Sequence, residues 1–63
     1  MNPTHAIEQL RAARLTEKAI ALRVGVTQPT INRIRHGVMQ PSWETGEALI
    51  RLAKKVTRSK RHG

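Results

Sequence analysis

Amide and guanidinium side chains are grouped between residues 28 and 36, where the chain reads Gln-Pro-Thr-Ile-Asn-Arg-Ile-Arg-His. The amides of Gln28 and Asn32 can each pair with N6 and N7 of adenine, and the guanidinium of Arg33 can pair with O6 and N7 of guanine. Pro29 adds an apolar surface of the kind that contacts a thymine methyl group. These residue types indicate contact with the edges of base pairs.

Helical spacing would place these side chains on one face. Each residue advances roughly 100° around a helix axis, so Ile34 and Ile31 lie roughly 240° and 300° from Gln28. Asn32 and Arg33 lie roughly 40° and 140° from it. We therefore expect the two isoleucines to be buried and four residues to face outward for base contacts: Gln28, Pro29, Asn32 and Arg33. For Arg33, a phosphate contact remains an alternative.

The elements that must position this face are two short helices joined by a tight turn. The first is predicted over 17–24, with Thr16 as its N-cap and Gly25 ending it in a left-handed conformation. The second is predicted over 28–36, capped by Thr27 and ended by Gly37. This arrangement is typical of a helix-turn-helix.

Two further helices are predicted around this pair. One runs from Pro3 to Ala13, with Asn2 as its N-cap. The other runs from Trp43 to Val56, with Ser42 as its N-cap and an apolar stripe at helical spacing. The fold class that follows is all-α, a small four- to five-helix bundle containing a helix-turn-helix. Residues 1–56 are expected to form one DNA-binding domain, and residues 57–63, which lack apolar side chains, a flexible basic tail.

The charge balance favours an anionic partner. Twelve Lys and Arg residues stand against four acids, giving a formal net charge of +8 over 63 residues. Such a small basic domain usually binds nucleic acid or an anionic membrane surface, although charge also serves solubility. A cationic membrane peptide would keep one continuous apolar face, which the caps and glycines interrupt. RNA binding is disfavoured because the aromatic side chains that stack on bases are missing.

Other chemistry has little support in the sequence. There is no cysteine and no aspartate, and the three histidines lack ligand spacing. We therefore expect no metal, no cofactor, no small-molecule ligand and no enzymatic activity, since no nucleophile–base arrangement is visible. No membrane segment or signal peptide is expected either, which predicts a cytoplasmic protein.

Several residues are candidates for contacts outside the base-reading face. Trp43, the single aromatic residue, is expected to pack at the edge of the core, with a role in dimer contact as the alternative. The candidate dimer surface comprises Leu52 and Val56, with Trp43 as a possible contributor, although core packing is an equal alternative for Leu52. The predicted phosphate contacts are Arg14, Thr16, Lys18, Thr27, Arg35 and His36.

The segment from Gly25 to Gly37, together with Met39-Gln-Pro-Ser-Trp-Glu-Thr45, resembles the phage Cro and repressor-type helix-turn-helix proteins. The resemblance spans about residues 4 to 56, and the family's base-reading positions map onto the four residues named above. The family often has a phosphate-contacting Gln at the start of the second helix, where this chain has Glu17. That contact is not carried over, and Lys18 or the Thr16 hydroxyl would substitute.

The resemblance implies a transcriptional regulator of a bacterial cell or phage-infected host. Its expected partner is operator double-stranded DNA, bound as a homodimer that assembles on the site. The alternative is an antitoxin-type autorepressor whose main partner is a protein toxin.

Overall fold

The structure is a computed structural model that describes the backbone of residues 1–61 and the side chains of residues 1–57. This part of the chain contains four α-helices and no strand, which confirms the all-α class. The helices are α1 (Pro3–Ala12), α2 (Glu17–Val24), α3 (Gln28–Arg35) and α4 (Trp43–Arg61).

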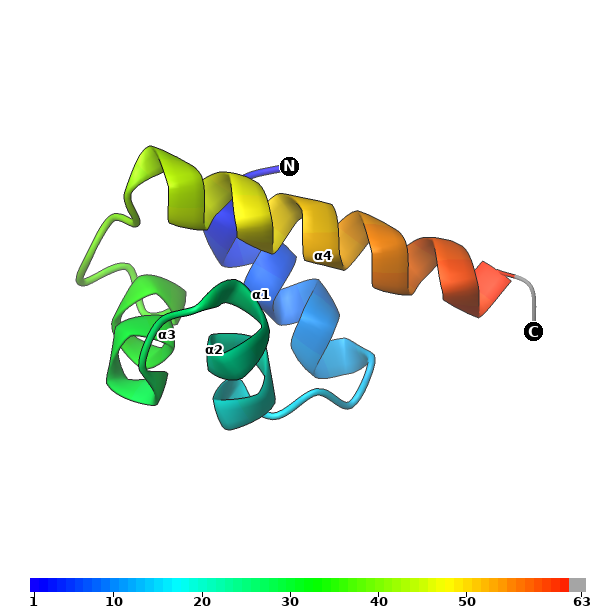
Figure 1. Cartoon of the computed structure of the whole chain (residues 1–63), viewed down its shortest axis with the longest axis horizontal. Coiled ribbons are helices and arrows are strands. Elements are labelled where there is room, and N and C mark those ends of the chain that lie inside the picture. Colours follow the sequence, from blue (N-terminus) through cyan, green and yellow to red (C-terminus); the bar gives the residue numbers. More distant parts are fainter. Residues whose placement is uncertain (62–63) are drawn as a thin grey trace.

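Helix α1 is the centre of the arrangement and packs against all three other helices. The long helix α4 lies across α1 on one side, whereas α2 and α3 lie together on the other (Figure 1). Within the described residues α3 contacts α1 and α2 but not α4. The helix-turn-helix pair therefore has one outer side that no other element covers.

Nine buried apolar residues form the core, and every helix contributes to it. These are Ala6, Ile7, Leu10, Ile20, Ala21, Ile31, Ile34, Leu49 and Ala53. No polar or charged side chain among residues 1–57 is buried. A chain this short buries only about 60% of the surface that its unfolded form exposes, so each helix must supply part of the core.

Three of the helices end in the same way, with one residue in the left-handed conformation. Gly25 has a φ of 81°, as the sequence predicts, and Gly37, the predicted end of the next helix, has a φ of 75°. Arg14 also adopts a positive φ, 73°, after α1. There the Leu15 N–H donates to the Leu10 carbonyl at 3.1 Å, and the same carbonyl accepts from the Ala13 N–H at 3.1 Å.

The helix starts follow the predicted caps with one exception. Asn2 and Thr16 each accept a hydrogen bond from a backbone N–H of the first turn, of His5 and Ala19 respectively. Thr27 occupies the N-cap position of α3, but its hydroxyl makes no such bond and lies 2.9 Å from the hydroxyl of Thr30. Pro29 lacks an N–H, so one of the two donors that a cap can use is missing.

The start of α4 differs from the sequence interpretation at Trp43. Its side chain is 78% exposed, so the expectation that it packs at the edge of the core is wrong. Gly46, in the first turn of α4, lies close to two prolines. A Cβ on Gly46 would lie 3.2 Å from Cγ of Pro3 and 3.6 Å from Cγ of Pro41. The lack of a side chain at Gly46 thus permits α1 and the α3–α4 loop to approach the first turn of α4 closely.

The helix boundaries agree with the predictions except at some C-terminal ends. Helices α1 and α3 each end one residue earlier than expected, at Ala12 and Arg35. Helix α4 continues to Arg61 rather than ending at Val56, because no glycine or proline interrupts it before then. Residues 57–61, which the sequence interpretation assigns to a flexible basic tail, therefore have helical backbone. Residues 62–63 and the side chains of residues 58–63 lie outside the described residues.

The left-handed backbone at Arg14 leads to a stability prediction. Both R14G and R14A remove the charge, but only glycine adopts this conformation without strain. We expect R14G to be more stable than R14A by about 1 kcal/mol. We expect G25A, the reverse change, to be less stable than wild type by about 1–2 kcal/mol. Urea unfolding of the three variants measures both differences, and equal stability of R14G and R14A would contradict the argument.

Candidate nucleic-acid interface

Helix α3 presents the face that its spacing predicts. Ile31 is 0% and Ile34 1% exposed, so the inner side of the helix is fully committed to the core. The four predicted base-contacting residues are all exposed: Gln28, Pro29, Asn32 and Arg33. The two amides and the guanidinium therefore share one accessible side of a helix whose other side is held rigidly.

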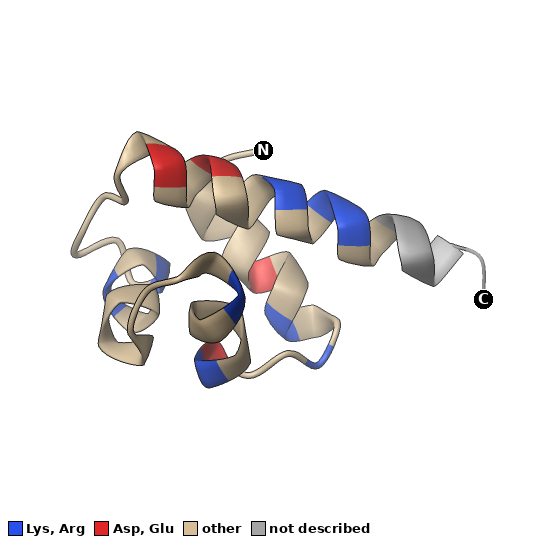
Figure 2. Ribbon diagram, viewed as in Figure 1, with Lys and Arg blue, Asp and Glu red and all other residues tan. Residues whose placement is uncertain are grey.

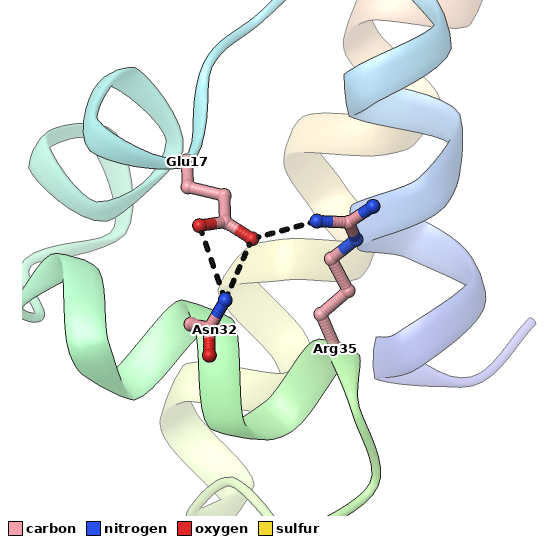
Figure 3. Close-up of polar contacts among 3 residues, drawn as sticks. All are labelled: Glu17, Asn32 and Arg35. Atoms are coloured by element: carbon pink, nitrogen blue, oxygen red, sulfur yellow. Dashed lines mark hydrogen bonds and ion pairs between the residues drawn. The ribbon is translucent and has the colours of Figure 1, made fainter.

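A polar cluster joins this face to the start of α2 (Figure 3). The Arg35 guanidinium donates from Nη1 to Oε2 of Glu17 at 3.0 Å, forming an ion pair between the two helices. The amide nitrogen of Asn32 lies 3.4 Å from the same oxygen and 3.5 Å from Oε1. Glu17 thus contacts two residues of α3, one of them a candidate base reader.

The environment of Glu17 favours its ionised form. The hydrogen bond from Arg35 is the largest cause and lowers the pKa of this carboxyl below its usual value. Desolvation opposes the change, whereas the Asn32 amide and the positive charges of Arg35 and Arg11 reinforce it. The carboxylate is therefore charged at neutral pH, and its side chain is only 12% exposed.

Basic positions lie along the loop after α1 and on α2 and α3, as well as on the middle turns of α4 (Figure 2). Among the predicted phosphate contacts, Arg14, Lys18 and His36 have exposed side chains, and so do Thr16 and Thr27. Arg35 is different, because its ion pair with Glu17 uses part of its charge. Arg35 is therefore less available to a phosphate group than the unpaired arginine that the sequence interpretation assumes.

Two features of this surface are missing from the sequence interpretation. One is the bridge from Glu17 to α3, since neither helix pattern shows how far apart the two helices lie. The other is Arg11, which is exposed in the last turn of α1 and close enough to Glu17 to act on its pKa. Its position just before the loop to α2 is visible in the sequence.

The predicted dimer residues fall into two groups. Leu52 and Val56 are half-buried and pack against the core of their own chain. Trp43, by contrast, is exposed and borders a groove of about 700 Å³ between the start of α1, the α3–α4 loop and α4. Exposed Val38 and Met39 on the loop extend the apolar character of this region.

Comparisons with models of known protein families, with curated proteins and with solved structures found no match to this chain. Two further searches concern the described residues alone. No helix there combines the length and apolar character needed to cross a bilayer. No three His, Asp or Glu side chains gather there in a way that would hold a metal ion.

The ion pair between α2 and α3 leads to a prediction about stability and pH. Removing Glu17 and Arg35 singly and together should reveal a coupling of roughly 0.5–1 kcal/mol at neutral pH, allowing for solvent screening. Because folding lowers the pKa of Glu17, this contribution is present above the unfolded-state pKa. It is lost as the pH falls through the lower folded-state value.

Urea unfolding of E17Q, R35M and the double variant at several pH values measures this coupling. The exposed pair between Glu47 and Arg51, 2.7 Å apart on α4, is a matched control within one helix. Its coupling should be roughly 0.3–0.5 kcal/mol. A coupling between Glu17 and Arg35 that persists at strongly acidic pH would contradict an electrostatic origin.

Proposed function

We propose that this chain is a sequence-specific double-stranded-DNA-binding protein that regulates transcription, with α3 entering the major groove. The observation that carries the proposal is the exposed face of α3, where Gln28, Asn32 and Arg33 lie opposite the buried Ile31 and Ile34. The major groove admits an α-helix, and these side chains match the hydrogen-bonding patterns of adenine and guanine there.

The distribution of charge supports the same orientation. In a helix-turn-helix the first helix crosses the DNA backbone while the second occupies the groove. Exposed Lys18 on α2, with Arg11 and Arg14 just before it, would then lie beside phosphates. The net charge of +8 provides the sequence-independent attraction to DNA.

The resemblance to Cro and repressor-type proteins makes a phage or bacterial repressor the most specific form of the proposal. Such a protein acts in the bacterial cytoplasm on operator DNA. The experiment that tests the proposal is selection of bound duplexes from a random pool. A consensus sequence supports it, whereas retention of all sequences alike would contradict it.

The base-reading face leads to a prediction for single variants. Q28A and N32A should each weaken binding to the selected duplex by about 1–3 kcal/mol and relax the preference at one or two base pairs. Binding of each variant to selected and random duplexes is measured by titration. Q40A, which removes an exposed amide from the loop before α4, is the control and should leave both affinities unchanged. Equal losses on both duplexes would indicate backbone contacts only.

We further propose that two copies bind one operator. One recognition helix contacts only a few base pairs, and two-fold related copies would place their helices about 34 Å apart, one turn of DNA. Trp43 is the best-placed apolar anchor for such an interface because it is exposed, whereas Leu52 and Val56 are partly used by the core. Exposed Arg51, Lys54 and Lys55 on α4 would repel a second free chain, so DNA phosphates are needed to offset the repulsion.

The variant W43A tests this interface. We expect sedimentation to show two wild-type chains on the selected duplex, and W43A to reduce the cooperativity of assembly while remaining folded. Leu22 on α2 has a comparable exposure of 74%, so L22A is the control for removing an exposed apolar side chain. Saturation at one chain per duplex would contradict the proposal.

A second candidate function also has an observation in its favour. An antitoxin-type autorepressor binds a protein partner in addition to DNA, and exposed Trp43 beside an apolar groove fits such a partner. In that case W43A would leave assembly on DNA unchanged.

A further inference from the structure

Glu17 stands where it can control how α3 uses its polar side chains. Its carboxylate lies within 3.4–3.5 Å of the Asn32 amide nitrogen and 3.0 Å from the Arg35 guanidinium. Figure 3 shows the Asn32 carbonyl oxygen pointing away from Glu17, while the amide nitrogen faces it. The contact therefore distinguishes the two ends of the Asn32 amide.

The hydrogen-bonding properties of the Glu17 carboxylate and the Asn32 amide favour one of the two amide orientations. An ionised carboxylate only accepts hydrogen bonds, whereas an amide has a donating NH2 and an accepting oxygen. Rotation of the amide by half a turn would place its oxygen against the negatively charged carboxylate. When one N–H of Asn32 is bound by Glu17, the amide still has a second N–H and its carbonyl oxygen. The free N–H can donate to N7 of adenine, and the oxygen can accept from the N6 amino group.

The same carboxylate restrains a cation. Arg35 lies on the α3 side of the interface, and its free guanidinium would bind any phosphate in reach. In the ion pair its charge is offset by Glu17, and the two side chains are only 35% and 12% exposed. By pairing with Arg35, Glu17 would weaken the attraction of this surface to DNA of any sequence. The same carboxylate orients the amide of Asn32, a candidate for base contacts.

We propose that Glu17 is a specificity-determining positioning residue, which presents Asn32 to adenine in one orientation and holds Arg35 back from the phosphate backbone. This inference rests on the proposed DNA-binding function. A purely structural role of Glu17 would not predict that one substitution changes specific and non-specific binding in opposite directions, whereas the proposed role does. Removing the Glu17 charge must weaken discrimination between bases while strengthening binding to random DNA.

The test compares wild type, E17Q and N32A on the selected duplex, on its single-base-pair variants and on random duplex. E17Q should reduce the preference for adenine at the base pair that N32A affects by roughly 3- to 10-fold. This is part of the roughly 5- to 150-fold that a bidentate amide–adenine pair provides. E17Q should also bind random duplex severalfold more tightly, with a slope of log affinity against log salt steeper by up to about 0.9.

A matched control exists on α4. Glu47 also forms an ion pair, with Arg51 at 2.7 Å, but contacts nothing on α3. E47Q removes the same charge and should leave every base preference as in wild type. R35M keeps the carboxylate beside Asn32 and should retain the adenine preference.

The free protein provides a measurement that does not depend on DNA. The side-chain amide resonances of Asn32 should shift as Glu17 is protonated, at a pH below the usual range of glutamate, because Arg35 lowers the pKa of Glu17. In E17Q this titration should vanish. Should E17Q fold poorly, the wild-type titration still decides whether Glu17 holds the amide.

The outcomes separate the inference from the proposed function. A wild-type protein that selects no sequence contradicts the proposed function. A wild-type protein that selects a sequence, with E17Q keeping the full adenine preference, overturns the inference alone. Asn32 resonances that ignore the protonation of Glu17 also overturn it.

Discussion

The burial of Ile31 and Ile34 determines which way α3 faces, and the rest of the candidate interface depends on it. Both side chains are at most 1% exposed, inserted between α1 and α2. Rotating α3 by a quarter turn would expose these two apolar side chains to water, which is unfavourable. It would also bury polar amides without hydrogen-bond partners, which is unfavourable as well. The outward direction of Gln28 and Asn32 is therefore a consequence of core packing rather than of their own contacts.

The charges around α3 add a second constraint to the one that core packing imposes. A chain with a net charge of +8 is attracted to any polyanion, and attraction by itself does not distinguish sequences. The carboxylate of Glu17 lies within this basic surface, paired with Arg35 and close to Asn32. In the proposed role, a negative group at this position would reduce general affinity for DNA while it orders the polar side chains around it. Specific binding is favoured when polar groups are ordered before the partner arrives.

Local signals in the sequence were sufficient for most of the fold. The caps at Asn2 and Thr16 and the left-handed Gly25 and Gly37 depend on interactions within a few residues, so short patterns predict them. The prediction failed at Trp43, which is 78% exposed and borders the groove between α1, the α3–α4 loop and α4, because the pattern of α4 alone does not show which of its apolar residues the other helices cover. Arg14 was likewise unexpected, because no glycine or asparagine marks the left-handed position after α1 in the sequence.

The sequence by itself determined the helical periodicity, and with it the face of α3 that carries two amides and a guanidinium. Periodicity is a property of one helix and needs no knowledge of its neighbours. Only the tertiary structure decided that Glu17 meets Asn32 and Arg35, which follow it by 15 and 18 residues. That meeting depends on how closely α2 and α3 approach across the turn. Their approach is determined by the shapes of buried side chains, which the spacing of polar residues does not record.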